Sequence, residues 1–230
     1  MLTVNCNLND CFLCRHCIPE WREIIAVKKT NLVIRKGKKI FEEGEKVSGI
    51  FFMYSGYAKI HMQWSDKKEL ILRFAGKGDV VGHRGLTGGE VYPVSATAIE
   101  DLEVCHISND FLDASLRTNP SLTLKFMQLY ASDLQKAEKR MRDLAHMEVN
   151  ARVAVALLEI AGFFGLNKDH DVNVPIARQD IASYAGTTYE TVFKFLKILT
   201  KAKIIALYGK SIRIHNLEKL RGFITTGKMG

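Results

Sequence analysis

The middle of the chain holds the feature that most constrains the fold, a long segment without helix breakers. From Pro120 to Met147 the sequence contains neither a glycine nor a second proline, and proline is well tolerated in the first turn of a helix. The segment therefore predicts one continuous helix. It divides the chain into a preceding part punctuated by glycine and a following part with shorter helical patterns.

Apolar residues recur along this predicted helix at alternating steps of three and four. They are Met127, Tyr130, Leu134, Ala137, Met141 and Leu144, with charged flanks at Lys136, Glu138, Lys139, Arg140 and Arg142. A single apolar stripe can simply pack on a neighbouring domain. Heptad spacing with charged flanks instead favours a seam between two copies of the helix. We therefore expect a homodimer, with a hinge at residues 146–150 after the seam.

The part before the helix, from about Asn31 to Ser108, reads as short strands separated by glycines. The glycines are Gly37, Gly44, Gly56, Gly76, Gly78 and Gly82, a rhythm typical of an all-β barrel or roll. Ile60, Met62 and Trp64 alternate with Lys59, His61 and Gln63, which predicts a strand with one buried and one solvated face. A polar turn at Ser65–Lys68 then leads to a partner strand, Glu69–Phe74.

The part after the helix has the pattern of a winged helix. The expected helices are Ala151–Phe164, Arg178–Ala185 and Thr188–Lys201, with a strand at Val172–Pro175 and a hairpin formed by Ile204–Leu207 and Ser211–His215. From Asn150 onward there are twelve Lys and Arg against six Asp and Glu, so this third of the chain carries +6 of the total +8. Such a basic region suits the neutralisation of nucleic-acid phosphates.

The helices Arg178–Ala185 and Thr188–Lys201 carry the strongest functional pattern. Ile181, Ala182, Ala185, Val192 and Leu196 fit the inside of two crossed helices, with Gly186 at the turn between them. The candidate DNA contacts are Arg178, Gln179, Thr188, Tyr189, Glu190, Phe193, Lys194 and Lys197. Glu190 and Lys194 share one helix face, where they suit cytosine N4 and guanine O6 or N7. Thr187 to Glu190 fits a capping box equally well, and Arg178 suits either a phosphate or a surface carboxylate.

Cysteines are concentrated near the N-terminus. Four of the five, Cys6, Cys11, Cys14 and Cys17, lie within twelve residues, and Cys105 follows far downstream. The chain has no run of about 18 apolar residues and no signal-peptide pattern, so we expect a cytoplasmic protein without a membrane span. In that compartment crowded cysteines favour metal binding or thiol redox chemistry over a disulfide framework.

Several of these motifs resemble the cyclic-AMP receptor / fumarate–nitrate reduction regulator (CRP/FNR) family. The motifs are the Arg-Gln-Asp-Ile opening at Arg178, the Glu-Thr-Val core at Glu190, the stretches Arg35–Gly44 and Ile50–Ile60, and the loop Gly78–Gly82. The resemblance extends from about Cys17 to Asn216. It implies a dimeric transcription regulator that binds a palindromic operator in double-stranded DNA and contacts RNA polymerase.

The resemblance also implies the fold class and the domains. The fold class is α+β, with an N-terminal double-stranded β-roll (cyclic-nucleotide-binding-like and cupin-like), a long dimerisation helix and a C-terminal winged helix-turn-helix. The expected domains are a Cys-rich segment at 1–18, the effector-sensing β-roll at 19–118, the dimerisation helix and hinge at 119–149, and the DNA-binding domain at 150–230. In the family, the positions of Glu190 and Lys194 face bases, whereas those of Arg178, Gln179 and Thr188 hold the DNA backbone. Lys194 replaces the usual arginine, and Phe193 stands where a small residue is common.

The sequence constrains the identity of the effector less than it constrains the fold. An effector pocket would involve Gly82, His83, Arg84 and Tyr92. Cyclic-AMP binders of the family have a glutamate at the position of His83 and an arginine within the region of residues 90–94, so we do not expect cyclic AMP. An iron–sulfur cluster would use three of Cys6, Cys11, Cys14 and Cys17 together with Cys105, because Cys17–Ile18–Pro19 resembles the last N-terminal ligand of the family's oxygen sensor and Cys105 its distant one.

Other ligands remain open. Zinc held by the four N-terminal cysteines would leave Cys105 as a core residue, and simple thiol redox chemistry or haem ligation by His61, His83 or His106 are further alternatives. The sequence has no phosphate-binding glycine loop, nucleophile elbow or paired metal-ligand histidines, so we do not expect an enzyme. The Cys11–Cys14 spacing fits a thiol redox protein but lacks the βαβ context of that motif.

Overall fold

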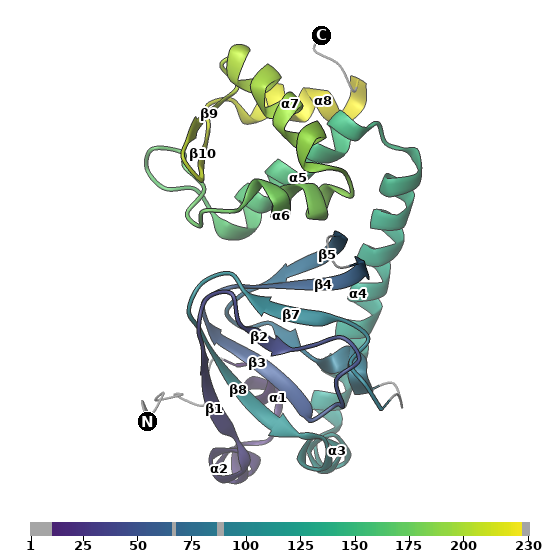
Figure 1. Cartoon of the computed structure of the whole chain (residues 1–230). Coiled ribbons are helices and arrows are strands. Elements are labelled where there is room, and N and C mark those ends of the chain that lie inside the picture. Colours follow the sequence, from purple (N-terminus) through teal and green to yellow (C-terminus); the bar gives the residue numbers. More distant parts are fainter. Residues whose placement is uncertain (1–10, 66–67, 87–89, 227–230) are drawn as a thin grey trace. The chain divides into compact units, whose positions relative to one another are not determined.

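The computed structural model describes residues 11–65, 68–86 and 90–226 and divides the chain into two compact units (Figure 1). The first unit is Met1–Gln135 and the second is Lys136–Gly230. Cys6, one of the candidate cluster ligands, lies outside the described residues. Within the described ranges, no helix combines the length and the apolar character that a membrane span requires.

Two four-stranded antiparallel sheets form a β-roll in the first unit. One sheet has the strand order β1-β8-β3-β6 and the other has the order β2-β7-β4-β5. The strands are β1 (Thr30–Ile34), β2 (Lys39–Phe41), β3 (Gly49–Ser55), β4 (Ala58–Ser65), β5 (Lys68–Ala75), β6 (Val80–Val81), β7 (Ser95–Ala98) and β8 (Leu102–Ser108). The roll expected from the glycine-punctuated sequence is confirmed, and so is the α+β class that the family resemblance implies.

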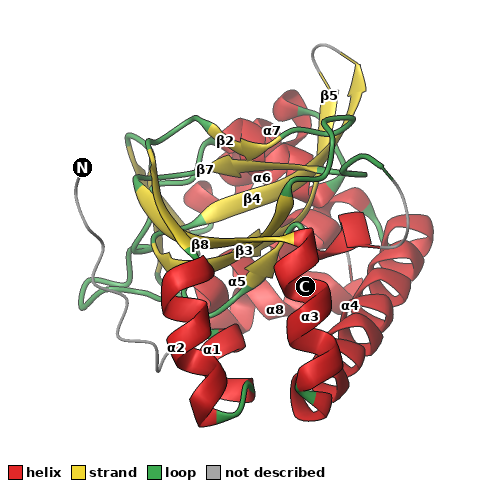
Figure 2. Cartoon of the chain, turned by 90° about the horizontal axis from the view of Figure 1, so that it is seen from below, coloured by secondary structure: helices red, strands yellow, loops and turns green. Residues whose placement is uncertain are grey.

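Helices pack against the outer face of the sheet that contains β3 and β8 (Figure 2). They are α1 (Phe12–His16), α2 (Pro19–Lys28), the 3-10 turn η1 (His83–Leu86), α3 (Asn109–Thr118) and the start of α4 (Pro120–His146). The indole of Trp21 in α2 stacks on Phe111 in α3, with ring centroids 6.0 Å apart, and its Nε1 donates to Ser115 Oγ at 2.9 Å. These contacts fix the N-terminal segment to the elements that lead into α4.

Strands β3 and β8 are buried on both faces because the roll interior lies on one side and the helices on the other. Phe51, Met53 and Val104 belong to the core between the sheets. Their neighbours Phe52 and Cys105 belong to a second core that includes residues of α1, α2, α3 and α4. Successive side chains of a strand point to opposite faces, so one strand contributes to two cores.

Strand β4 departs from the predicted alternation. Ile60 is buried as expected, but Met62 is 41% and Trp64 is 86% exposed, whereas His61 is buried. The pairing of β4 with β5 shifts register between Ile60 and His61 and again between Gln63 and Ser65. The prediction that Met62 and Trp64 share a buried face is therefore wrong, since such irregularities interrupt the period of two.

The second unit is a winged helix. Its elements are the C-terminal part of α4, α5 (Val149–Phe164), α6 (Arg178–Ala185), α7 (Tyr189–Lys201), β9 (Ile205–Tyr208), β10 (Ser211–Ile214) and α8 (Leu217–Thr226). Helix α5 packs against α6, α7 and α8. The predicted strand at Val172–Pro175 is wrong, because this segment forms only one isolated bridge, between Val172 and Leu166. Helix α8 was not predicted from the sequence.

Candidate nucleic-acid interface and cysteine layer

Helix α7 separates its side chains into an inner and an outer face as the sequence predicts. Val192 and Leu196 are completely buried, together with Phe195 and Leu199, which the sequence analysis did not include. Thr188, Tyr189, Glu190, Phe193, Lys194 and Lys197 are all exposed. Gly186 adopts the left-handed conformation (φ 64°) at the turn between α6 and α7, a position that favours glycine.

The start of α7 differs from the predicted capping box. The N-cap is Thr188, whose Oγ1 accepts a hydrogen bond from the Thr191 backbone N–H at 3.3 Å. A box that starts at Thr187 is therefore wrong by one residue. Glu190 occupies the second helical position, where its own backbone N–H and the Thr188 side chain lower the pKa of its carboxyl group. The carboxylate is fully exposed and charged.

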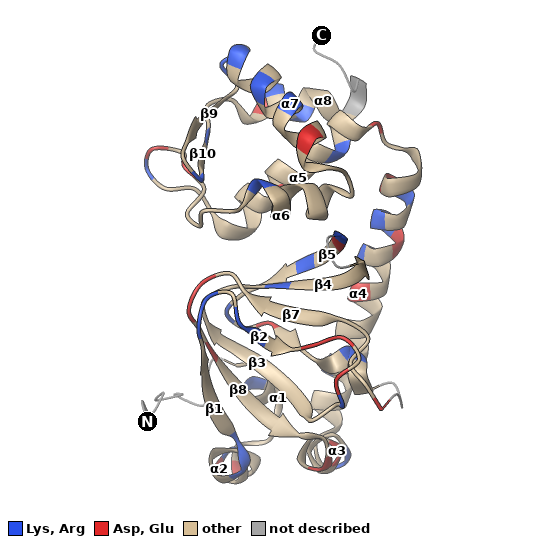
Figure 3. Ribbon diagram, viewed as in Figure 1, with Lys and Arg blue, Asp and Glu red and all other residues tan. Residues whose placement is uncertain are grey.

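Two rows of side chains follow the outer face of α7. In the first row, the rings of Tyr189 and Phe193 are nearly parallel at a centroid distance of 6.1 Å, and Lys197 Nζ lies 4.5 Å from the Phe193 centroid. In the second row, Glu190 and Lys194 are one turn apart and interact electrostatically. Helix α7 carries three lysines against one glutamate (Figure 3), which suits a negatively charged ligand.

Arg178 begins α6 and contacts the tip of the wing. Its NH2 group donates to the Gly209 carbonyl at 2.9 Å, in the turn between β9 and β10. The base of the wing is held by Arg213, whose guanidinium binds both carboxylate oxygens of Asp171 at 2.9 Å. The predicted partners of Arg178 were a phosphate or a carboxylate, and the structure places it on a backbone carbonyl.

Two arginines that the sequence analysis did not assign to the interface hold the turn of the helix-turn-helix. Arg152 in α5 donates to the carbonyls of Ala185 and Gly186, at 3.2 and 3.3 Å, and to those of Met147 and Leu144, at 3.0 and 3.4 Å. Arg140 in α4 donates to the Tyr184 carbonyl and lies over the Tyr184 ring at 4.3 Å. The sequence signal for Arg152 is a lone charge in the apolar run Val149–Leu158.

Four cysteines share the second core of the first unit, which we call the cysteine layer. Cys11, Cys14 and Cys17 from the N-terminal segment and Cys105 from β8 are all buried in it and are not joined by disulfides. The layer also contacts α4, because the Phe12 ring packs edge-on against Phe126 at 5.1 Å. Residues about ninety positions apart in the sequence therefore place their thiols in one apolar core.

The thiols of the cysteine layer differ in acidity. Hydrogen bonds from the Cys14 side chain and backbone lower the pKa of Cys11 to about 7, against the opposing effect of burial. Burial, together with the nearby Cys11, raises the pKa of Cys17 to about 12. Soft, buried thiols suit iron or zinc in chemistry. In the described part of the chain, however, no three His, Cys, Asp or Glu side chains converge as a metal site would require.

The loop that follows β6 is occupied by contacts within the first unit. His83 is buried, its Nε2 lies 3.2 Å from Asp133 Oδ2 in α4, and its carbonyl accepts a hydrogen bond from the Tyr130 hydroxyl at 2.5 Å. The Arg84 guanidinium lies 3.7 Å from Asp133. Burial opposes ionisation of Asp133, but the His83 hydrogen bond and the Arg73 charge outweigh it and lower its pKa to about 2.

Tyr92 completes this region from inside the roll. Its ring stacks on Phe41 at 4.2 Å, and its hydroxyl donates to the Gly49 carbonyl at 2.8 Å. Gly82 adopts φ 85°, and a Cβ there would lie 3.3 Å from the Gly49 carbonyl oxygen and 3.5 Å from Tyr92. The four predicted pocket residues are therefore close together, with Tyr92 and His83 engaged by the protein itself.

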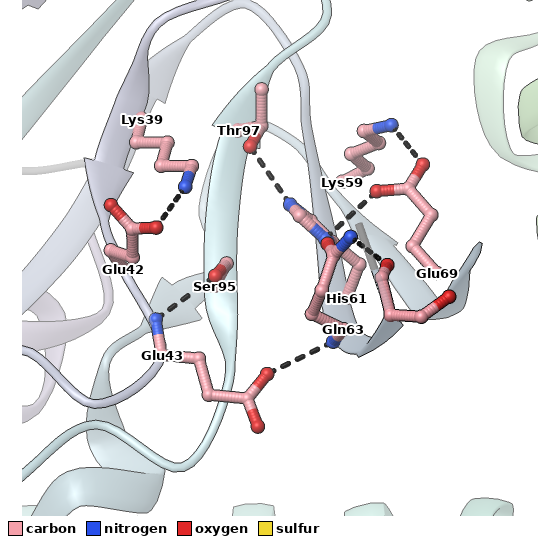
Figure 4. Close-up of polar contacts among 10 residues, drawn as sticks. Lys39, Glu42, Glu43, Lys59, His61, Gln63, Glu69, Ser95 and Thr97 are labelled. Atoms are coloured by element: carbon pink, nitrogen blue, oxygen red, sulfur yellow. Dashed lines mark hydrogen bonds and ion pairs between the residues drawn. The ribbon is translucent and has the colours of Figure 1, made fainter. Parts of the chain in front are cut away.

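The other two candidate haem ligands lie in different sheets. His61 in β4 uses both ring nitrogens, since Nδ1 lies 2.9 Å from Glu69 Oε2 and Nε2 lies 2.8 Å from Thr97 Oγ1 (Figure 4). Burial opposes ionisation of Glu69, but hydrogen bonds from His61 and Lys59 hold its pKa at about 2. His106 lies in β8, with its ring 4.8 Å from that of Phe51.

Most of the predicted dimer seam is exposed. Met127, Leu134 and Met141 are 64%, 60% and 67% exposed and follow one another at intervals of seven residues. Ala137 is also exposed. Tyr130 differs, because it is half-buried against the cysteine layer and bonded to the loop at His83. The exposed part of the stripe is therefore Met127, Leu134, Ala137 and Met141.

Comparison with known proteins identifies both units. Residues 32–119 match the cyclic nucleotide-binding domain model, and residues 151–223 match the Crp-like helix-turn-helix domain model. The chain is 26% identical over 219 residues to the fumarate and nitrate reduction regulatory protein of Vibrio cholerae, covering 92% of this chain and 87% of that protein. It is 29% identical over 204 residues to the anaerobic regulatory protein of Bacillus subtilis, covering 86% and 85%.

A solved structure agrees with these relatives. FixK2 from Bradyrhizobium japonicum superposes with a TM-score of 0.74 and 28% identity, covering 84% of this chain and 96% of that one. The chain belongs to the CRP/FNR family of transcription regulators. This membership means that the CRP/FNR regulator described here binds DNA and forms dimers, and the resemblance stated from the sequence is confirmed.

Lys194 is the residue of this CRP/FNR regulator that we expect to read a base most directly. Replacing Lys194 by Ala should reduce discrimination at one base pair of each half-site by about 1–3 kcal/mol, because a hydrogen bond to the base edge is lost. Competition binding with operator duplexes changed at single positions measures this loss. Lys219→Ala, an exposed lysine on α8, is the matched control. Unchanged discrimination in Lys194→Ala would remove Lys194 from the base-reading residues.

Proposed function

We propose that this regulator senses a redox or gaseous signal with its cysteine layer and reads a palindromic operator as a homodimer. The observation that carries the sensing role is the orientation of Cys105. This residue faces away from the roll interior and into the same core as Cys11, Cys14 and Cys17. A cysteine that served only to fill the roll would instead belong to the core between the sheets, as its neighbour Val104 does.

The residues that would hold an iron–sulfur cluster are Cys105 and three of Cys6, Cys11, Cys14 and Cys17. Such a cluster supplies reactivity toward oxygen, nitric oxide and redox reagents. Helix α1 contains Cys14 and is capped by Cys11 and Cys17, and cluster binding requires this segment to shift so that thiols from it converge with Cys105. The relatives named for anaerobic regulation and for fumarate and nitrate reduction are consistent with this class of signal.

The cysteine layer contacts the dimerisation helix directly within the first unit. Phe12 in α1 packs against Phe126 in α4, and the Ile18 backbone N–H donates to Asn119 Oδ1 at 2.9 Å, just before α4 begins. A shift of α1 therefore changes the packing of the first turns of α4. In a dimer this would alter the pairing of the two helices and the spacing of the two α7 helices on successive half-sites. RNA polymerase is the further partner we expect at the bound operator.

Cyclic AMP does not suit the loop after β6. His83 stands where the cyclic-AMP binders of the family have a glutamate, and its ring contacts Asp133. The Arg84 guanidinium contacts the same carboxylate. A cyclic phosphate would need an arginine that is not already paired and a pocket that Tyr92 does not fill. An unidentified small ligand at this loop remains the alternative, and it would have to displace these contacts.

The test is the absorption spectrum of protein purified without oxygen, together with iron and sulfide analysis. We expect broad absorption near the visible edge, iron and sulfide in similar amounts, and bleaching in air. Cys105→Ala should lose most of the iron, because one of about four required thiolates is removed. Val104→Ala, the neighbouring residue on the opposite face of β8, is the matched control and should keep its iron.

Other outcomes contradict the proposal in distinct ways. Zinc without sulfide would identify a structural metal site, and retention of that zinc in Cys105→Ala would place it on the N-terminal cysteines. Colourless, metal-free protein that resists cluster reconstitution would overturn the cluster and direct attention to a ligand at His83. Operator binding by wild-type protein should persist as a separate readout in each case.

A further inference from the structure

The outer face of α7 carries two exposed aromatic residues beside the charged side chains that suit hydrogen bonds to bases. Tyr189 and Phe193 are 41% and 40% exposed, whereas the aromatic Phe195 on the opposite face is buried. Exposing large apolar side chains to water is unfavourable, and they do not contribute to the core of the winged helix. Their position next to Glu190 and Lys194 places them on the same surface that would meet base edges.

The neighbours of Phe193 fix its position on that surface. Tyr189 lies one turn before it with the ring planes 11° apart, and Lys197 lies one turn after it with Nζ over the ring. A lysine over an aromatic face is held by electrostatic attraction to the ring. The ring is thus ordered between a stacked tyrosine and a cation, and it presents an apolar surface rather than a hydrogen-bonding group.

In the major groove only one base offers an apolar group, the 5-methyl of thymine. A phenyl ring makes no hydrogen bond to the edges of guanine, cytosine or adenine, so it favours a base step where a methyl group is available for contact. We propose that Phe193 is a specificity-determining residue that reads the 5-methyl group of a thymine in each half-site. This proposal rests on the placement of α7 in the major groove that the proposed function includes.

The roles of the two rows on α7 are then complementary. Glu190 and Lys194 select bases by hydrogen bonds, whereas Phe193 selects the adjacent thymine by contact with its methyl group. Tyr189 supports the Phe193 ring. Lys197 contacts the same ring and also approaches the DNA phosphates. Phe193 stands at a position where a small residue is common in the family. We therefore expect the operator of this protein to differ from those of other members at the base pair that contains this thymine.

The experiment replaces thymine by deoxyuridine, which removes only the methyl group. Operators are first selected from a pool of randomised duplexes with the full-length protein, and each thymine of the selected duplex is then substituted in both half-sites. For wild-type protein we expect one position at which the affinity falls about three- to five-fold per methyl group, the value for one buried methyl-sized group. Phe193→Ala should bind the thymine and deoxyuridine duplexes equally.

Two further variants complete the design. Phe193→Leu keeps an apolar side chain and should retain a methyl dependence, and Phe163→Ala, which removes a similarly exposed aromatic from α5, should behave as wild type. If no thymine methyl affects wild-type binding, or if Phe193→Ala keeps the full dependence, the inference is overturned while the proposed function stands. If no sequence is enriched from the pool, sequence-specific reading by α7 fails and the inference fails with it.

Discussion

A chain that carries Leu134→Glu together with Met141→Glu should be monomeric and should bind operator DNA at least roughly one hundred-fold more weakly than wild type. Both side chains are about two-thirds exposed on α4 and lie seven residues apart on one face. In a dimer, the substitutions place four like charges along a seam that otherwise excludes water. A monomer can contact only one half-site, so it loses the effective concentration that linkage of two α7 helices provides.

Sedimentation equilibrium and operator titration measure the two consequences separately. Gln135→Glu together with Lys139→Glu is the matched control, because it adds two carboxylates to exposed positions of the same helix away from the seam. The control should remain dimeric and lose only a few-fold in affinity from its charge. A stable dimer of the seam variant at micromolar concentration would contradict the assignment of the dimer interface.

Replacing Arg152 by Ala should destabilise the winged-helix unit by about 2–4 kcal/mol. The guanidinium donates to four carbonyls. One lies near the end of α4, one lies in the hinge after α4, and two lie at the turn between α6 and α7. Half-buried carbonyls that lose a charged donor are costly to leave without a partner. Because Gly186 sets the angle between the two helices, we also expect a loss of operator affinity at temperatures where the unit is still folded.

Denaturant unfolding and operator binding of the same samples test this expectation. Arg142→Ala is the control, since Arg142 is exposed on α4 and pairs with its neighbour Asp143, and its effect should stay within about 0.5 kcal/mol. Arg152→Lys should recover little, because an ammonium group cannot reach carbonyls on two elements at once. Wild-type stability of Arg152→Ala would show that these hydrogen bonds are not needed to hold the turn.

The winged helix and the long helix could be predicted because their signals are local. The inner residues of α6 and α7 repeat with the helical period, Gly186 marks a turn that requires positive φ, and the segment after Pro120 contains no helix breaker. The exposure of the candidate DNA contacts on α7 follows from the same period. Helix α8 was missed because its short amphipathic pattern follows directly after a predicted hairpin.

The features missed from sequence depend on distant contacts. The orientation of Cys105 follows from the register of β8 against β1 and β3, and no local pattern distinguishes the two faces of a strand buried on both. The pairing of His83 with Asp133 joins residues fifty positions apart, and the exposure of Trp64 results from register shifts in a hairpin. Arg152 is visible as a lone charge in an apolar run, but its four carbonyl partners are not.

The alternation along β8 has a consequence for how regulators of this architecture can diversify. Val104 and Cys105 are adjacent in sequence. A substitution of Val104 changes the packing of the core between the sheets, whereas a substitution of Cys105 changes the packing of the core that includes α1. The sheet thus separates two hydrophobic cores, and each core can be altered by substitutions on one face of β8. Substitutions of every second residue of β8 would therefore alter the core that holds the cysteines and leave the side chains in the core between the sheets unchanged.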